Sequence, residues 1–219
     1  MSDSVMSTIR QHGVIPVIAV ESVDDALPLA DALIEGGLPI AEITFRTAAA
    51  ADVIAILAKE RPELLVGAGT VLTLDNLNAA INCGAAFGVA PGTNPEIICE
   101  AFDAEWPFVP GVATPSDVEG GLSLGCQTLK FFPAGAMGGP AMLKALAGPY
   151  KHTGVDFVPT GGVSLDNLTD YLDLDVVAAC GGTWLAKADD LKAGAFDVIR
   201  DRCRQAVQLV QQIRGKNQV

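Results

Sequence analysis

Short apolar runs alternate with longer amphipathic stretches along the whole chain. The short runs are rich in Val, Ile and Phe, whereas the longer stretches are rich in Ala and Leu, with apolar residues at helical spacing. This alternation predicts eight strand–helix units. The predicted strands are 14–20, 39–45, 64–70, 87–91, 107–112, 128–134, 156–162 and 176–182.

The predicted strands are continuous apolar runs, and helical stretches rather than hairpin turns separate them. Such strands are typical of parallel sheets that are covered by helices. Eight units in 219 residues fit an α/β fold of the compact (β/α)₈ TIM-barrel type, and an open doubly wound sheet is the competing arrangement. No linker or low-complexity tract divides the chain, so we expect a single domain over residues 1–219. Residues 2–11 are expected to form a helix that caps the N-terminal end of the barrel.

Polar residues gather at the carboxyl ends of the predicted strands, where α/β proteins place their chemistry. Side chains alternate along a strand, so Glu42, Thr44 and Arg46 share one face of the second strand. The residues between them are apolar and should meet the helices. We therefore expect the polar face to point into the barrel.

The sixth strand has a lysine in the middle of an apolar run. The same alternation turns Thr128, Lys130 and Phe132 inward, so Lys130 should point at Glu42 and Arg46. A buried ammonium group costs several kcal/mol unless it is paired or loses its proton. The lysine therefore requires a structural or a chemical explanation.

Two interpretations of Lys130 remain open. In the first, Lys130 and Glu42 form a buried ion pair that contributes to packing, with Arg46 as a second partner. In the second, burial and the nearby Arg46 cation favour a neutral amine, which attacks a ketone and forms a Schiff base while Glu42 moves protons. One lysine, one carboxylate and one arginine at a barrel mouth favour the second interpretation.

Glycine-rich segments follow the last two strands. The segments "TGG" at 160–162 and "CGGT" at 180–183 offer unobstructed backbone N–H groups where barrels commonly bind phosphate. Turn glycines are the alternative explanation for either segment alone, but the two together predict a phosphate site. Arg46 can hold a carboxylate with two hydrogen bonds, Thr70 can add a hydroxyl group, and Pro91 should shape the pocket wall.

Charge and cysteine content narrow the class of protein. The net charge is −12 and the 14 Lys and Arg residues are scattered, which argues against nucleic-acid and membrane partners and favours a small-molecule substrate. The five cysteines lack C-x-x-C spacing and fit reduced thiols in the cytoplasm. The two histidines lie far apart, without ligand-type neighbours. We therefore expect a cytoplasmic protein with no metal or other cofactor.

Six segments resemble, in their order and spacing, the bacterial 2-keto-3-deoxy-6-phosphogluconate (KDPG) aldolase family. They are "AEITFRT", "VGAGTV", "VAPGTNPE", "LKFFPA", "PTGGV" and "GGTWL", and the likeness covers nearly the whole chain. The resemblance implies a Schiff-base aldolase on a (β/α)₈ barrel that acts in the Entner–Doudoroff pathway. It also implies a homotrimer.

The resemblance implies a role for each candidate site residue. Lys130 corresponds to the Schiff-base lysine and Glu42 to the general acid/base. The substrate-binding roles are the pyruvyl carboxylate for Arg46 and Thr70, the pyruvate pocket for Pro91 and Phe132, the ketone for Thr160, and the phosphate for Gly161, Gly162 and Thr183. Phe45 and Thr183 stand where the family often has Leu and Ser, and neither difference weakens the assignment.

The sequence leaves the substrate open within this class. Cleavage of KDPG to pyruvate and glyceraldehyde 3-phosphate is the leading hypothesis. The galacto epimer, 2-keto-3-deoxy-6-phosphogalactonate, and 4-hydroxy-2-oxoglutarate are alternative aldols. A phosphosugar isomerase or epimerase without covalent catalysis would leave Lys130 unexplained. The combination of Lys130, Glu42 and Arg46 argues against a barrel that only binds a phosphorylated metabolite.

Overall fold

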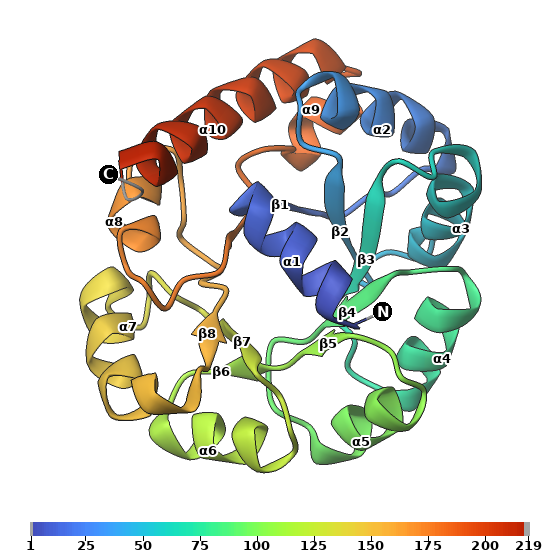
Figure 1. Ribbon diagram of the computed structural model, residues 1–219. Helices are drawn as coiled ribbons and strands as arrows, with labels where there is room; N and C mark the ends of the chain where they lie inside the picture. Colours follow the sequence, from blue (N-terminus) through green and yellow to red (C-terminus); the bar gives the residue numbers. More distant parts are fainter. Residues whose placement is uncertain (1, 217–219) are drawn as a thin grey trace.

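Strands occupy the middle of the molecule and helices surround them (Figure 1). The computed structural model describes residues 2–216. The strands are β1 (Val14–Ile18), β2 (Ile40–Thr44), β3 (Leu65–Gly69), β4 (Phe87–Val89), β5 (Phe108–Val109), β6 (Gly111–Val112), β7 (Thr128–Phe131), β8 (Asp156–Phe157) and β9 (Cys180–Gly182). The helices are α1 (Ser2–His12), α2 (Ala26–Glu35), α3 (Ala50–Glu60), α4 (Leu74–Asn82), α5 (Pro95–Asp103), α6 (Pro115–Ser123), α7 (Gly139–Ala147), α8 (Leu168–Leu172), α9 (Ala188–Lys192) and α10 (Phe196–Lys216), with the 3₁₀ helices η1 (Val23–Asp25) and η2 (Gly148–Thr153).

The strands form two parallel sheets. One has the order β5-β4-β3-β2-β1-β9 and the other has the order β6-β7-β8. Pro110 separates β5 from β6 because proline has no N–H group for the ladder, yet its carbonyl accepts the N–H of Lys130 at 2.8 Å. At the other boundary, isolated bridges join Phe157 to Val177 and Thr160 to Gly181. Backbone hydrogen bonding therefore extends across both boundaries.

The predicted parallel sheet with intervening helices is confirmed, and its strands are shorter than expected. The predicted strand 156–162 keeps only residues 156–157 in the ladder, and the predicted strand 176–182 keeps 180–182. Gly161 and Gly162 have left-handed φ values of 89° and 84°, which end the extended conformation after β8. The sequence pattern does not predict α9, because its five residues are too few to show helical periodicity.

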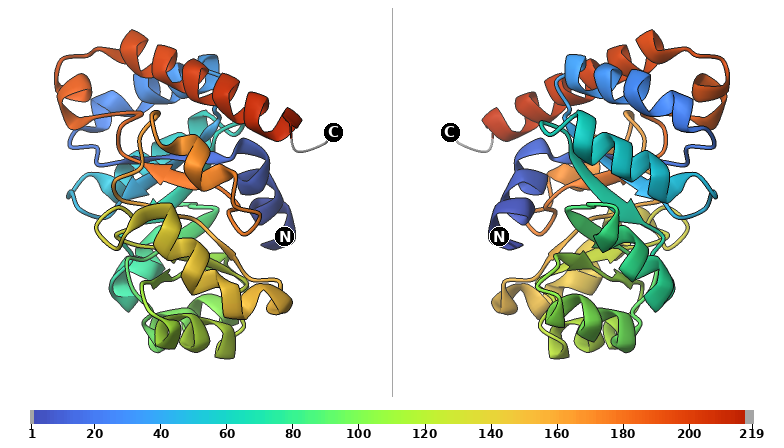
Figure 2. Two further views of the ribbon diagram at one scale, coloured as in Figure 1. Left: turned by 90° about the vertical axis from the view of Figure 1, so that its left-hand side faces the viewer. Right: turned by 90° about the vertical axis from the view of Figure 1, so that its right-hand side faces the viewer.

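Helix α1 covers the end of the molecule at which the strands begin, as predicted for residues 2–11 (Figures 1 and 2). Arg10 of α1 forms an ion pair with Asp156, the first residue of β8. Arg214 of α10 donates to the carbonyl of Ala178 at 3.0 Å, just before β9. A cavity of about 530 Å³ lies between these three charged residues and their neighbours, at the opposite end from the carboxyl ends of the strands.

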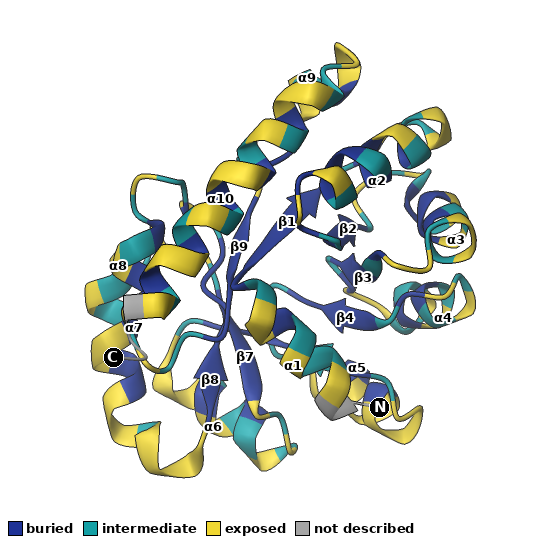
Figure 3. Ribbon diagram, turned by 45° about the horizontal axis from the view of Figure 1, so that its top comes forward, coloured by how far each residue is buried: buried dark blue, intermediate teal, exposed yellow. Residues whose placement is uncertain are grey.

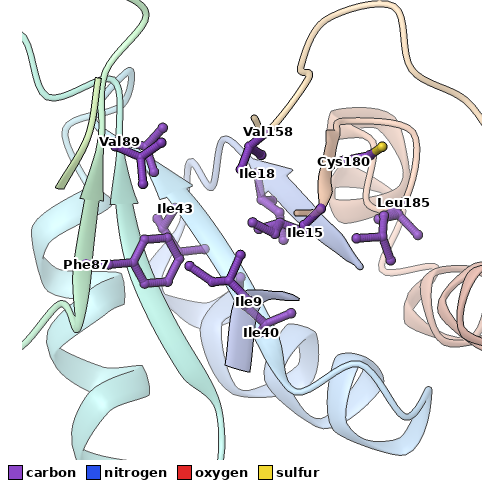
Figure 4. Packing of buried hydrophobic residues seen from close by; sticks show 14 of the residues in the cluster. Ile9, Ile15, Ile18, Ile40, Ile43, Phe87, Val89, Val158, Cys180 and Leu185 are labelled. Carbon is purple, nitrogen blue, oxygen red and sulfur yellow. The ribbon is translucent and has the colours of Figure 1, made fainter. Parts of the chain in front are cut away.

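Apolar side chains from the strands and from the inner faces of the helices form one buried cluster (Figures 3 and 4). The cluster includes Ile9 of α1, so the capping helix is part of the core. Glycines make room for its large members, since a Cβ at Gly67 would lie only 2.6 Å from a ring carbon of Phe87. Within residues 2–216, the helices are too short or too polar for a bilayer span.

Candidate active site

Glu42 lies in the middle of β2 with its side chain inside the molecule, and the residue is 3% exposed. Its strand pairs with β1 on one side and β3 on the other, so main-chain hydrogen bonds hold the side chain in position. A Cβ at Gly69 of β3 would lie 2.6 Å from Cγ of Glu42 and closer still to Oε1. Glycine at this position therefore leaves the space that the carboxylate occupies.

Lys130 lies on β7 and is 5% exposed. Its Nζ donates a hydrogen bond to Oε1 of Glu42 at 3.1 Å and lies 5.6 Å from the ring centroid of Phe132. The strand neighbours Leu129 and Phe131 belong to the apolar core. The predicted alternation along this strand and the predicted contact between Lys130 and Glu42 are therefore confirmed.

This contact places an amine beside a carboxylate, and both residues are buried. A lysine must lose a proton before it can attack a carbonyl carbon, and a carboxylate at hydrogen-bonding distance can accept or return protons. Reduced access to water also strengthens electrostatic interactions within the pair. The arrangement can support covalent catalysis through an imine.

Arg46 is exposed, which corrects the expectation that it points into the barrel. Strand β2 ends at Thr44, and the N–H of Arg46 turns back to the carbonyl of Thr44 at 2.7 Å. Strand alternation therefore no longer applies at position 46. The Nε of Arg46 donates to Oγ1 of Thr44 at 3.1 Å, so the side chain remains attached to the carboxyl end of the strand that carries Glu42.

Thr70 and Pro91 follow the ends of β3 and β4. Thr70 has a φ of 59°, a value that β-branched residues rarely adopt and that is often associated with functional sites. The N–H of Val71 holds this turn by donating to the carbonyl of Val89 at 3.1 Å. Pro91 is half-buried, and its carbonyl lies where a Cβ at Gly111 would be. Both residues are therefore fixed at the carboxyl edge of the sheet.

Backbone hydrogen bonds join the loops that follow β7 and β8. The N–H of Ala134 donates to the carbonyl of Thr160 at 2.8 Å, and the N–H of Gly135 donates to the carbonyl of Gly161 at 2.7 Å. A Cβ at Gly161 would lie 3.3 Å from the ring of Phe132. Phe132 and the "TGG" segment therefore lie side by side, and Thr160 is buried.

The two predicted phosphate segments lie at adjacent strand ends. The bridge between Thr160 and Gly181 brings the end of β8 to β9, and Thr183 is exposed directly after β9. The side-chain amide of Asn167 donates to the carbonyl of Gly162 at 2.9 Å and holds the "TGG" loop. The sequence pattern does not predict that Asn167 belongs to the site. Its one local signal is its position three residues after Ser164, because the Oδ1 of Asn167 accepts the N–H of Ser164 in a local turn.

Comparison with known proteins identifies the family. The chain matches the sequence profile of the KDPG and KHG aldolases over residues 5–202. It is 43% identical over 207 residues to a 2-dehydro-3-deoxy-phosphogluconate aldolase of Treponema pallidum (strain Nichols), across 94% of this chain and 98% of that protein. It is 42% identical over 205 residues to a KHG/KDPG aldolase of Escherichia coli (strain K12), across 94% of this chain and 95% of that protein.

A solved structure agrees with these sequence matches. The KDPG aldolase of Legionella pneumophila, with pyruvate captured at low pH as a covalent carbinolamine intermediate, superposes with a TM-score of 0.88. The two chains are 38% identical, and the match covers 92% of this chain and 97% of the Legionella chain. Both the sequence and the fold therefore lead to one conclusion: this chain belongs to the KDPG and KHG aldolase family.

Proposed function

We propose that this protein is a Schiff-base aldolase that cleaves 2-keto-3-deoxy-6-phosphogluconate to pyruvate and glyceraldehyde 3-phosphate in the Entner–Doudoroff pathway. The observation that carries the proposal is the buried contact between Lys130 Nζ and Glu42 Oε1 at 3.1 Å. The carbinolamine captured in the Legionella relative supports the same chemistry. A purely structural role explains the pair less well, because a buried ion pair often stabilises a fold no better than apolar residues of similar volume.

Lys130 is the nucleophile in the proposed mechanism. Lys130 transfers a proton to Glu42, and its neutral amine adds to the C2 ketone. Glu42 returns the proton to the carbinolamine hydroxyl, which leaves as water and gives an iminium ion. Glu42 accepts the proton of the C4 hydroxyl while the C3–C4 bond breaks, and the bonding electrons move into the iminium to give an enamine. Glyceraldehyde 3-phosphate leaves as the aldehyde. Glu42 then protonates C3, and hydrolysis of the iminium releases pyruvate and the free amine.

The substrate carboxylate and ketone occupy the carboxyl ends of β2, β3, β4 and β7 in this proposal. Arg46 and Thr70 hold the carboxylate, because a guanidinium matches both carboxylate oxygens and a hydroxyl adds a further donor. Pro91 and Phe132 line the pyruvate pocket, and Thr160 lies beside the ketone. The 5.6 Å distance from Lys130 Nζ to the ring of Phe132 supports this placement.

The phosphate occupies the glycine-rich loops after β8 and β9 in this proposal. Gly161 and Gly162 have left-handed φ values and no Cβ, so their N–H groups can approach an anion closely. The exposed hydroxyl of Thr183 adds a further donor. The bridge between Thr160 and Gly181 supports a shared site, because it holds the two loops at neighbouring strand ends.

We propose that the two sheets are parts of one closed (β/α)₈ barrel and that the chain is a single domain. In this description β5 and β6 are one strand interrupted at Pro110, which gives eight strands. The bridges between Phe157 and Val177 and between Thr160 and Gly181 support closure. We also place the enzyme in the cytoplasm as a homotrimer, and the free state of all five cysteines agrees with a reducing compartment.

Reductive trapping tests the proposed function. Incubation with pyruvate and borohydride should inactivate the enzyme irreversibly and add one reduced pyruvyl group to Lys130, because borohydride converts the iminium to a stable amine. Peptide mapping by mass spectrometry locates the adduct. The exposed lysines at 59, 144, 151, 187 and 192 are internal controls for non-specific modification. An adduct on one of these lysines would contradict the role of Lys130. The absence of any adduct would refute the Schiff-base mechanism and leave a non-covalent isomerase or epimerase as the alternative.

A second substrate is favoured by the relatives. The E. coli relative is named a KHG/KDPG aldolase, so we propose 4-hydroxy-2-oxoglutarate as a slower substrate of the same site. Turnover of this compound, of KDPG and of the galacto epimer should be compared under identical conditions. We expect KDPG to have the highest kcat/KM. A higher value for the galacto epimer would reassign the natural substrate without changing the chemistry.

A further inference from the structure

The hydroxyl group of Thr44 on β2 forms hydrogen bonds both to strand β1 and to the side chain of Arg46. The residue is 1% exposed and is the last residue of β2. Its Oγ1 donates to the carbonyl of Ile18 on β1 at 3.1 Å, and the same oxygen accepts the Nε–H of Arg46 at 3.1 Å. A hydroxyl group has one donor and two acceptor positions, so both bonds can form at once. The carbonyl of Ile18 therefore orients the hydroxyl whose lone pair receives Arg46.

Backbone hydrogen bonds also restrain the turn that carries Arg46. Its N–H donates to the carbonyl of Thr44 at 2.7 Å, and the N–H of Phe45 donates to the carbonyl of Gly69 on β3 at 2.8 Å. The chain therefore turns sharply after β2, with both neighbouring strands fixing the turn. The side chain of Arg46 is exposed, and only Nε has a hydrogen-bond acceptor within residues 2–216. The terminal nitrogens of the guanidinium remain available for a ligand.

We propose that Thr44 is a positioning residue for substrate recognition. Its hydroxyl fixes the Nε side of Arg46, so that the two terminal nitrogens are already oriented for the carboxylate of the keto acid. An exposed arginine otherwise loses rotamer freedom when it binds a ligand, and orienting it in advance reduces that loss. This inference rests on the proposed function, because it gives Arg46 the substrate carboxylate as its ligand.

The chain offers a matched control at Thr47. Its Oγ1 donates to the carbonyl of Val20 at 2.6 Å, so Thr47 also ties the segment after β2 to the segment after β1. In contrast to the hydroxyl of Thr44, that of Thr47 forms no hydrogen bond with the side chain of Arg46 within residues 2–216. Thr44→Val and Thr47→Val each remove one such hydroxyl and keep the shape of the side chain. Only Thr44→Val removes the acceptor of Arg46.

The experiment measures inactivation by borohydride over a range of pyruvate concentrations. We expect Thr44→Val to raise the half-saturating pyruvate concentration roughly tenfold to a hundredfold, as for a lost hydrogen bond to a charged group, while the inactivation rate at saturation changes less than about twofold. Thr44→Ser restores the hydroxyl and should behave like the wild type. Thr47→Val should also behave like the wild type.

A double-mutant cycle shows whether Thr44 acts through Arg46. In an Arg46→Met background, Thr44→Val should have almost no additional effect, because the group that Thr44 positions is gone. Thr44→Ala is a second variant without the hydroxyl, and it must show the same dependence on Arg46 if Thr44→Val fails to fold. Equal effects of the Thr44 and Thr47 variants, or the same effect with and without Arg46, would overturn the inference. Failure of the wild type to trap pyruvate would instead refute the proposed function.

Discussion

A single absent methyl group, at Gly69, leaves the space in which the Glu42 carboxylate meets Lys130. A Cβ at position 69 would lie 2.6 Å from Cγ of Glu42, far inside normal van der Waals distance. The hydrogen bond between the two side chains is 3.1 Å long, so a displacement of about 1 Å would break it. The geometry of the proposed catalytic pair therefore depends on a residue that has no side chain.

Gly69→Ala tests this dependence. We expect the protein to fold and kcat to fall roughly tenfold to a thousandfold. A positioned acid/base raises the rate by about two to four orders of magnitude, and the alanine should displace Glu42 only in part. Trapping of pyruvate on Lys130 should persist at a reduced rate. Exchange of the pyruvate methyl protons with deuterium, followed by NMR, measures the proton transfer itself.

Gly148→Ala is the control for this substitution. A Cβ at Gly148 would have no atom within 4 Å, and its φ of −49° suits alanine. We expect wild-type exchange and turnover from this variant. If Gly69→Ala also exchanged protons at the wild-type rate, the dependence of the Glu42 position on Gly69 would be contradicted.

At the level of strands and helices, the sequence predicts which way a side chain points within one strand. Alternation along a strand correctly turns Glu42 and Lys130 inward, because each lies within a regular extended segment. It fails for Arg46, which lies beyond the end of β2, where the backbone turns. The need for Gly69 and the bond from Thr44 to Ile18 depend on register between neighbouring strands. Strands β1 and β2 are buried at every position, and the pattern of a strand that is buried on both faces does not specify the register to one residue.

The short helix α9 is attached to α10 through the carboxylate of Asp190. Both oxygens of Asp190 accept hydrogen bonds from Arg202 of α10, and Oδ2 also accepts the N–H of Lys187 at 3.1 Å. The hydrogen bond from Arg202 lowers the pKa of the Asp190 carboxyl below its ordinary value, although burial acts in the opposite direction. Five residues cannot form a stable helix alone, so α9 depends on this attachment.

Asp190→Asn should lower the free energy of unfolding at pH 7 by about 1–2 kcal/mol, the range for hydrogen bonds to a charged group. The pKa of Asp190 is lower in the folded state than in the unfolded state. Its stabilising effect is therefore complete above the unfolded value of about 3.9 and is lost as pH falls toward the lower folded value. Urea unfolding at several pH values should show a constant difference from pH 7 to pH 5 that shrinks below pH 4.

Asp201→Asn is the matched control on α10. Its ion pairs with Arg200 and Arg204 are largely exposed, and exposed pairs contribute less than about 1 kcal/mol. We expect a small change that does not depend on pH in the same way. Equal losses from the two variants would show that Asp190 contributes no more than an exposed surface charge.

The whole molecule combines an acidic surface with a strongly exposed aromatic residue on α5. The net charge of −12 makes separate copies repel each other, so association requires a local apolar gain. Phe102 on α5 is 70% exposed and borders a groove of about 280 Å³ that Ile98, Trp106 and Leu124 also line. An exposed aromatic ring beside an apolar groove is typical of protein contact surfaces. We therefore expect the proposed homotrimer to bury Phe102.

Phe102→Glu should convert the proposed trimer to a monomer, because each interface of that trimer would bury a charge in place of an aromatic ring. Light scattering coupled to size-exclusion chromatography measures the mass, which should fall from about three copies of the 22.6 kDa chain to one. Val198→Glu on α10 adds the same charge at a residue that is 37% exposed, and it should remain trimeric. Phe102→Ser separates loss of apolar contact from added repulsion and should also weaken association. A wild-type monomer would refute the trimer, and a trimeric Phe102→Glu variant would move the interface to another face of the molecule.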